Sequence, residues 1–453
     1  MVQLSQSRRK ASVSPSHMVF MWFGSFIMLG TILLWLPMSH TSPGVKLDFV
    51  TALFTAVSAA CVTGLSVVNV HDTFSTFGQV VIFMLMEMGG MGIMTFASLG
   101  FRLFGRRLSL SQQAATTDAI YQNDAASEFK KTFMSILKVT LAIQALGAVA
   151  IAFTLVPHHW HNGERLFMIW SAVFHASSAF CNSGFTLYQN ALQPFYGNIP
   201  FLVLILILVT LGGLGHIVLN ELYRLPGYIR NHVKKPHWIS LHTRVVLVMT
   251  ALLIVVGVLS IWLLGTEDEG SSLWHAIFET VSGRTAGFSI VNQVRLPLPS
   301  IIVILFLMFV GGSPGSCAGG IKTTSLAIWI ARIRANLRND ANVNMFGYTI
   351  APELVSRARV LMAVTMIWNV VGVFILAIIH PDENLQTLIF EQISAFGTVG
   401  LSMDFTPKLT AASELWIIIS MFVGRLGPLS IALWVVRSSK VKINQPIGRV
   451  MVG

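Results

Sequence analysis

The sequence predicts an all-α membrane protein in which eight transmembrane helices form four span–helix–span repeats with pseudo-fourfold symmetry. Its 453 residues are 54% hydrophobic and only 11% charged, with a mean hydropathy of +0.70, whereas a soluble domain carries roughly 25% charged residues. Eight apolar runs are long enough to cross a bilayer, which takes about 20 residues. Four look-alike segments recur between pairs of these runs, and their recurrence indicates internal duplication.

The apolar runs set the domain organisation. They lie near 18–38, 76–100, 133–156, 199–222, 244–264, 299–331, 358–380 and 413–436. A look-alike segment that is too short to span lies inside each pair, so we expect a re-entrant helix and a glycine turn there. The predicted parts are an N-terminal tail at 1–17, repeats at 18–105, 130–225, 243–335 and 356–437, and a C-terminal tail at 438–453.

The charge pattern predicts the orientation in the bilayer. Lys and Arg account for the net charge of +11 and gather in alternate connections, at 8–10, 102–138, 224–244, 332–359 and 437–449. The positive-inside rule places both termini and these basic loops in the cytoplasm. A basic protein can also bind nucleic acid, but here the charge flanks membrane spans. We therefore expect this chain to lie in a lipid bilayer and to bind no nucleic acid.

The four look-alike segments share one pattern at 54–66, 174–186, 278–289 and 390–402. Each begins with Phe, continues through a Ser to a glycine, and ends with Leu or Phe followed by Ser or Thr. The serines are Ser58, Ser178, Ser282 and Ser394, and the glycines are Gly64, Gly184, Gly287 and Gly400. The third segment is one residue shorter between its Ser and its Gly.

Four such turns around one axis would suit a dehydrated cation. Backbone carbonyls can replace a hydration shell when several segments present them in a ring, and glycine permits the unusual dihedrals this needs. The turns carry no carboxylate, which favours monovalent over divalent ions, and the C-terminal ends of four helices would add negative potential. The alternative is that the glycines only close tight turns. The candidate ligands are Val62, Thr63, Gly64, Asn182, Ser183, Gly184, Thr285, Ala286, Gly287, Thr398, Val399 and Gly400.

The second span of each repeat carries a glycine pair or its equivalent, at 89–92, 212–215, 311–315 and 424–427. For the first two, close helix packing explains the glycines. The third continues as GGSPGSCAGG and predicts a broken span over 311–324, because so many breakers do not sustain a helix. Irregular backbone at this depth persists only where protein buries it or a water-filled cavity adjoins it. The predicted break contains Gly311, Gly312, Ser313, Pro314, Gly315, Ser316, Cys317, Ala318, Gly319 and Gly320.

These features together resemble the Trk/Ktr/HKT superfamily of potassium transporters, and the eight spans are similar to the Ktr-type membrane subunit. The resemblance implies potassium uptake across the bacterial inner membrane, stimulated by sodium, through a channel-like filter of four turns. It also implies a homodimer and a cytosolic ring of regulatory subunits that binds the nucleotide, so that this chain itself binds none. The family's gate is a loop in the sixth span, which corresponds to 311–320 here. The channel signature TVGYG is absent, and the nearest match is Thr398 to Leu401.

Arg425 stands where the other second spans have glycine. A cation at membrane depth is costly and should face the bundle interior. We predict that Arg425 hydrogen-bonds the carbonyls of the gate loop or repels ions there, which would hold the gate shut. The alternative is a structural arginine paired with a fixed acid.

Other polar residues are expected to support the filter. Glu279 and Glu391 follow the Phe of their segments, and Arg284 lies close before Gly287 and could pair with either acid. The three cysteines show no metal-binding spacing and are interpreted as buried thiols. His158, His159 and His161 resemble a metal cluster only by chance, in our interpretation.

Two other classes of protein were considered. A secondary transporter with alternating access usually contains two inverted halves, whereas these four quarters run in the same direction. An intramembrane enzyme needs a nucleophile with a base, or a metal site, and no polar residues here suggest one. We therefore expect a transport protein that is not an enzyme.

Overall fold

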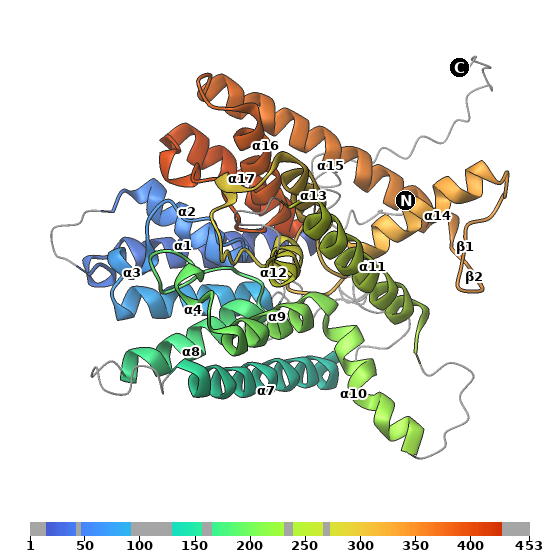
Figure 1. Cartoon of the computed structure of the whole chain (residues 1–453), viewed down its shortest axis with the longest axis horizontal. Helices are drawn as coiled ribbons and strands as arrows, with labels where there is room; N and C mark the ends of the chain where they lie inside the picture. Colours follow the sequence, from blue (N-terminus) through green and yellow to red (C-terminus); the bar gives the residue numbers. More distant parts are fainter. Residues whose placement is uncertain are drawn as a thin grey trace, which may run out of the picture.

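The computed structural model describes residues 15–41, 47–91, 129–155, 165–230, 239–265 and 272–427, and these residues are mostly helical (Figure 1). The first quarter contains α1 (Pro15–Trp35), η1 (Pro37–Ser39), α2 (Phe49–Ala60), α3 (Val70–Thr73) and α4 (Thr76–Gly90). The second contains α7 (Phe129–Leu155), α8 (Arg165–Phe180), η3 (Gln193–Phe195), α9 (Ile199–Leu214) and α10 (His216–Arg230).

The second half of the chain repeats this order with one addition. The third quarter contains α11 (Leu241–Leu264), α12 (Leu273–Gly283), η4 (Gln293–Arg295), α13 (Leu298–Phe309) and α14 (Thr323–Leu337). The hairpin of β1 (Asn344–Met345) and β2 (Tyr348–Thr349) follows. The fourth quarter contains α15 (Pro352–Ile379), α16 (Leu385–Gly397), η5 (Thr406–Lys408) and α17 (Ala411–Leu426).

Local sequence explains where several of these helices begin. Ser75 and Ser240 cap α4 and α11 by accepting hydrogen bonds from backbone N–H groups in the first turn, which satisfies donors that the helix leaves free. Asn198 caps α9 in the same way and is followed by a proline in the first turn, a position that proline favours. Thr410 forms a reciprocal capping box at the start of α17.

Length and apolar character mark several helices as membrane spans. Among the described residues, Met134–Leu155, Leu241–Leu264 and Pro352–Ile379 are each long and apolar enough to cross a bilayer, and α9 with α10 would make a fourth if the bent pair is one span. Shorter apolar helices include α2, α4 and α13. The runs predicted at 76–100 and 413–436 are described only as far as residues 91 and 427.

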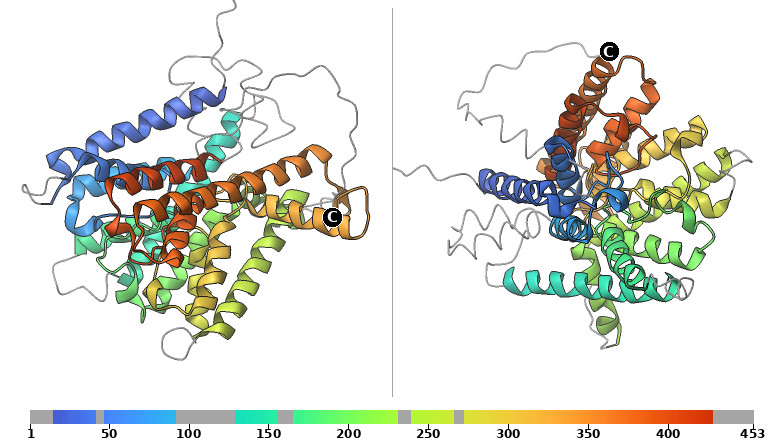
Figure 2. Two further views of the ribbon diagram at one scale, coloured as in Figure 1. Left: turned by 90° about the horizontal axis from the view of Figure 1, so that it is seen from above. Right: turned by 90° about the vertical axis from the view of Figure 1, so that its left-hand side faces the viewer.

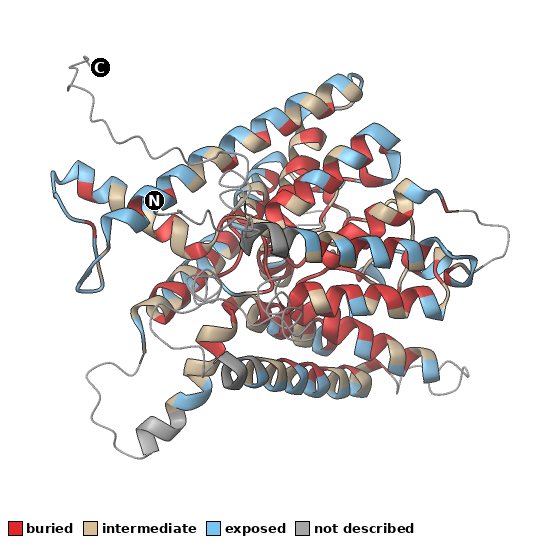
Figure 3. Ribbon diagram, turned by 180° about the vertical axis from the view of Figure 1, so that it is seen from behind, coloured by how far each residue is buried: buried red, intermediate tan, exposed pale blue. Residues whose placement is uncertain are grey.

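Buried side chains join neighbouring quarters of the chain. One cluster combines α1, α2 and α4 with α16 and α17, and it includes Phe23, Phe54 and Phe405. Two further clusters join the second quarter to the third and the third to the fourth. Large apolar side chains such as Leu146 and Phe153 on α7 remain exposed, and Figure 3 shows the buried residues gathered where helices meet. This distribution suits a bundle whose outer faces contact lipid.

Two spans are interrupted. The run at 299–331 is divided into α13 and α14 by residues 310–322, as the glycine-rich segment predicts. The run at 199–222 is also divided, because α9 and α10 meet at 104°. The sequence analysis expected close packing rather than a break at this point. Gly215 supplies the bend with a φ of +84°, a value that favours glycine.

Glycines allow the second span of a repeat to touch the end of its short helix. A Cβ on Gly89, Gly212 or Gly424 would lie 2.1, 1.8 or 1.8 Å from the carbonyl oxygen of Ala60, Phe180 or Phe396, respectively. No side chain fits at those distances, so close packing of small residues holds α4, α9 and α17 against the helices that precede the glycine turns. In Figure 2 (right), α7 lies along the outer edge of the bundle.

Several predicted features fall outside the described residues. They are residues 1–14 of the N-terminal tail, the C-terminal tail, the basic segment at 102–128 and the three histidines at 158, 159 and 161.

We expect Gly212→Ala to destabilise the fold by about 1–3 kcal/mol or more, because the new methyl group overlaps the Phe180 carbonyl. Gly24→Ala in α1 is the matched control, since nothing lies within 4 Å of its added Cβ, and it should be neutral or stabilise by up to about 1 kcal/mol. Thermal unfolding of both variants in detergent measures the difference, and equal midpoints would contradict this packing.

Candidate ion pathway

The four glycine turns share an unusual backbone. Each glycine has a positive φ, at 88° for Gly64, 69° for Gly184, 74° for Gly287 and 98° for Gly400. The residue two positions earlier also has a positive φ, at 57° for Val62, 58° for Asn182, 72° for Thr285 and 49° for Thr398. A non-glycine residue in this region is uncommon, so its occurrence at four matched positions indicates a shared constraint on the turns. Such strained residues cluster at functional sites.

The turns contact one another in a closed cycle. An added Cβ would lie 2.2 Å from the Ser183 carbonyl oxygen at Gly64, 2.7 Å from that of Ala286 at Gly184, 2.3 Å from that of Val399 at Gly287 and 2.3 Å from that of Thr63 at Gly400. Each glycine therefore touches the residue before the next glycine, and the fourth turn returns to the first. The structure thus brings the four glycines and the four residues before them, eight of the twelve predicted filter residues, into one ring.

A serine in each short helix holds its turn in place. Ser58 accepts a hydrogen bond from the Gly64 N–H at 3.1 Å and donates one to the Leu65 carbonyl at 2.7 Å. Ser394 accepts from the Gly400 N–H at 3.2 Å. Ser178 and Ser282 donate to the carbonyls of Phe185 and Phe288, respectively. The recurring serine is therefore explained by backbone groups of the turn that would otherwise lack a partner.

The shorter third segment reaches the ring by a tighter turn. The Thr63 N–H donates to the Ser58 carbonyl, five residues back, whereas the Ala286 N–H donates to the Ser282 carbonyl, four residues back. Both bonds are short, at 2.8 and 2.9 Å. One residue fewer therefore changes the hydrogen-bonded loop and not the position of the glycine in the ring.

The ring also contains hydroxyl groups that lack partners. The side-chain oxygens of Thr63, Thr285 and Thr398 are buried and have no hydrogen-bond partner within the described part of the chain. Thr285 and Thr398 lie against segment 311–320, because an added Cβ on Gly311 would lie 3.4 Å from the Thr285 Cγ2 and one on Gly319 would lie 2.1 Å from the Thr398 Oγ1. The C-terminal ends of α2, α8, α12 and α16 lie directly before the four turns, and their partial negative charge favours a cation.

The interrupted second span of the third repeat lies against the interrupted second span of the second repeat. The N–H groups of Ser313 and Cys317 donate to the carbonyls of Gly213 and Gly212 at 3.1 and 3.3 Å, and the Ser313 hydroxyl donates to the Leu214 carbonyl. These carbonyls are the ones that the bend after α9 releases from helical bonding. The two breaks therefore satisfy one another, which explains why both can exist at membrane depth.

Two positively charged side chains also bind segment 311–320. Arg425 donates to the carbonyls of Cys317 and Gly89, and it therefore bridges α17, the segment 311–320 and α4. Lys322 donates to the Ala318 carbonyl at 2.6 Å. Consecutive carbonyls of the segment are thus held by two positive side chains. The ammonium group of Lys322 therefore turns back toward the segment that precedes it.

The predicted support residues contact the loops after the turns. Glu391 accepts hydrogen bonds from Ser402 at 2.7 Å and Thr406 at 2.5 Å. Glu279 accepts one from Gln293 at 3.0 Å. Neither carboxylate forms an ion pair with Arg284 in the described part of the chain, so the pairing suggested for Arg284 is not found. Polar partners from the following loop have taken its place.

A match to a protein-family model shows to which family the chain belongs. The family is described as TrkH, cation transport protein, and its model matches residues 5–442. The chain belongs to the TrkH family. This result confirms the family that the four repeats predicted.

Several known proteins are similar to this chain over nearly all of its length. It is 34% identical to the potassium/sodium uptake protein NtpJ of Enterococcus hirae, over 99% of this chain and 100% of that one. It is 32% identical to the Ktr system potassium uptake protein B of Bacillus subtilis, over 97% of each chain. The crystal structure of the potassium transporter TrkH from Vibrio parahaemolyticus has the same fold, with a TM-score of 0.70 at 17% identity over 95% of this chain and 86% of that one.

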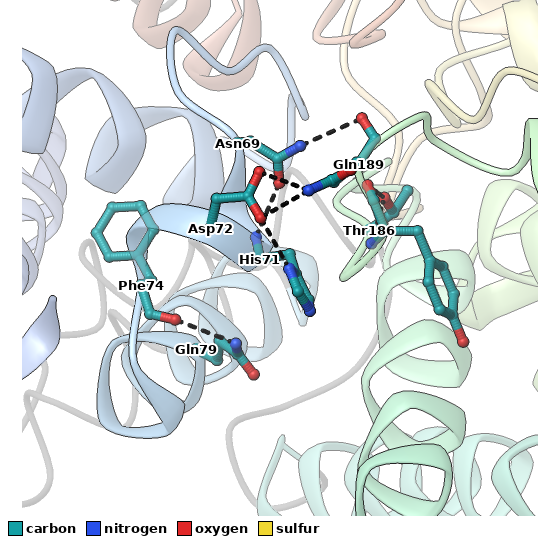
Figure 4. A network of polar contacts seen from close by, with 8 residues as sticks. Asn69, His71, Asp72, Phe74, Gln79, Thr186 and Gln189 are labelled. Carbon is teal, nitrogen blue, oxygen red and sulfur yellow. Dashed lines mark hydrogen bonds and ion pairs between the residues drawn. The ribbon is translucent and has the colours of Figure 1, made fainter. Parts of the chain in front are cut away.

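Two features of this TrkH-family chain were not predicted from its sequence. The break at Gly215 was interpreted as helix packing, although a polar His216 directly after a glycine-rich run was an available signal. Contacts between the loops that follow the turns were also missed. Gln189 donates to both carboxylate oxygens of Asp72 at 3.0 and 3.1 Å, and Asn69 donates to the Gln189 carbonyl at 3.2 Å (Figure 4). These partners lie more than 100 residues apart in the sequence, so no local sequence pattern predicts the contacts between them.

A similar contact joins the other two repeats, where Asn292 donates to Asp404 at 2.9 Å. Both contacts tie the loop of one repeat to that of the next. Hydrogen bonds from Gln189 and His71 hold the pKa of Asp72 below its ordinary value of 3.8. A lowered pKa means that the charged form favours the folded contact, so the contact persists above pH 3.8 and weakens only as the pH falls through the lowered pKa.

We expect Asp72→Asn to increase hydrogen exchange in residues 186–190 at neutral pH, because an amide nitrogen would face the Gln189 amide. The difference from the wild type should persist down to about pH 4 and disappear at lower pH, where Asp72 is protonated. Asp404→Asn changes the other pair of loops and is the control. Equal exchange in wild type and Asp72→Asn at pH 7 would show that this contact does not order the loop.

Proposed function

We propose that this chain is the membrane subunit of a potassium uptake system and conducts potassium through the ring of four turns. The observation that carries the proposal is the closed cycle of contacts between the glycines and the carbonyls of Thr63, Ser183, Ala286 and Val399. Carbonyl and hydroxyl oxygens in such a ring can replace the hydration shell of potassium. The names of the relatives in Enterococcus hirae and Bacillus subtilis support potassium as the ion.

The proposed architecture has eight spans in four repeats around a pseudo-fourfold axis. The protein would lie in the inner membrane of a bacterium with both termini in the cytoplasm, so that the turns open outward. Inward flow would then be driven by the membrane potential, which is worth about 2.3 kcal/mol per charge per 100 mV. A homodimer and a cytosolic ring of nucleotide-binding subunits belong to the proposal through the family alone.

Sodium is proposed as a second ion. The Enterococcus hirae relative is a potassium/sodium uptake protein, and Leu401 stands where a potassium channel has tyrosine. A filter without the channel signature would discriminate less strictly between the two ions. Sodium would then act either as an activator or as a co-transported ion.

Segment 311–320 is proposed as the gate below the ring. It contacts the ends of α9 and α17 and binds two cationic side chains, which together hold it across the path of an ion. Opening would require Arg425 to release the Cys317 carbonyl and the segment to leave Gly212 and Gly213. The cytosolic partner would supply the free energy for this change.

The ring is tested with Gly287→Ser, which introduces a side chain against the Val399 carbonyl. Uptake in a potassium-uptake-deficient strain at low external potassium should fail, or should lose potassium-over-sodium discrimination by about tenfold, which corresponds to 1.4 kcal/mol. Gly283→Ala is the matched control, because its added Cβ approaches nothing closer than 3.7 Å. Normal selectivity in Gly287→Ser would argue against the ring as the filter.

The gate is tested with Arg425→Ala in proteoliposomes that contain no partner subunit. Loss of charged hydrogen bonds worth about 1.5–3 kcal/mol should raise rubidium leak by about tenfold or more. Arg425→Lys keeps the charge without the forked donors and should give an intermediate leak. A leak in Arg425→Ala that equals the wild-type leak would reject the gating role.

A further inference from the structure

The three cysteines of the chain lie close to the proposed gate. Cys61 and Cys181 occupy equivalent positions, directly after the ends of α2 and α8, and Cys317 belongs to the segment 311–320. All three are free thiols with at most 1% of their surface exposed. The proposed function uses none of them.

Two of these thiols are neighbours. Cys181 and Cys317 belong to the same buried cluster, and their side chains interact electrostatically. The backbone holds them there, because the Cys317 N–H donates to the Gly212 carbonyl at 3.3 Å and Gly212 packs against Phe180, the residue before Cys181. Cys61 belongs to a different cluster, so the two repeats differ in this respect.

A positive charge adjoins the thiol pair. The guanidinium of Arg425 donates to the Cys317 carbonyl and interacts electrostatically with the cysteine side chains. Protonated thiols carry no charge, so they leave that guanidinium without a counter-ion among them. A complex with one net negative charge would complement it in this low-dielectric environment.

We propose that Cys181 and Cys317 form a two-coordinate binding site for a soft monovalent metal cation such as Ag⁺ or Cu⁺. Thiolates select soft ions of this class. Binding of M⁺ by two thiols releases two protons to water and leaves a bis-thiolate complex with one negative charge, which Arg425 neutralises. A divalent ion would give a neutral complex and leave Arg425 uncompensated, so the site favours monovalent ions.

Binding would also block transport. The metal would join the end of α8 to the segment 311–320 and prevent that segment from moving. The route to the site rests on the proposed function, because a filter that strips water from monovalent cations would admit Ag⁺ from outside. The metal site itself needs only the two thiols and Arg425.

The first experiment measures binding and needs no transport. The purified full-length chain in chloride-free detergent is treated with silver nitrate, desalted and analysed for silver by mass spectrometry. Cys181→Ser and Cys317→Ser should each lose about one silver ion per chain relative to wild type, whereas Cys61→Ser should not. In wild type, silver should protect Cys181 and Cys317, but not Cys61, from alkylation, which tests the site even if a variant does not fold.

The second experiment measures block of rubidium flux by Ag⁺ in proteoliposomes, with each variant compared with its own flux without silver. Cys181→Ser should require about tenfold more silver for half block, and Cys61→Ser should resemble wild type. Equal sensitivity and equal silver content in Cys181→Ser and wild type would overturn the site. Silver binding to the wild type that depends on both cysteines, together with no rubidium flux even in the Arg425→Ala variant, would keep the site and reject the proposed function.

Discussion

The structure depends on the approach of four glycines to four carbonyl groups. Each contact is closer than any side chain permits, and the four contacts close on themselves from Gly64 through Gly184 and Gly287 to Gly400. A cycle of this kind fixes the relative positions of all four quarters, because a shift of one turn breaks contacts with two neighbours. The short helices, their serines and the glycines of the second spans serve to hold these turns in place.

Close contacts between a glycine and a carbonyl group also occur next to the ring. Gly89, Gly212 and Gly424 let the second spans touch the ends of the short helices. The third repeat departs from this pattern, because its Gly311 would meet the Gly319 carbonyl of the same interrupted segment instead. Departure from the repeat therefore coincides with the segment that binds α9, Arg425 and Lys322. The position where the symmetry of the sequence fails is the one that we propose as the gate.

The glycine turns could be predicted from the sequence because their signal is local and occurs four times. Glycine with a serine five or six residues earlier indicates a backbone conformation that glycine adopts most readily. Arg425 was predicted to contact carbonyls of the interrupted segment because a charge at this depth needs a partner. The bend at Gly215 was not predicted, since a single glycine at a helix-packing position looks the same whether or not the helix continues.

The sequence by itself determined the family of the protein and the positions of the glycine turns, because these follow from hydropathy, periodicity and glycine. Tertiary structure decided which groups pair across the repeats. Glu279 and Glu391 could have paired with Arg284, but hydroxyl and amide groups of the following loops reach them first. Cys181 and Cys317 are adjacent, although 135 residues separate them, because carbonyls freed by one broken helix bind the N–H groups of another. Such pairings depend on distances in space, and no local pattern encodes them.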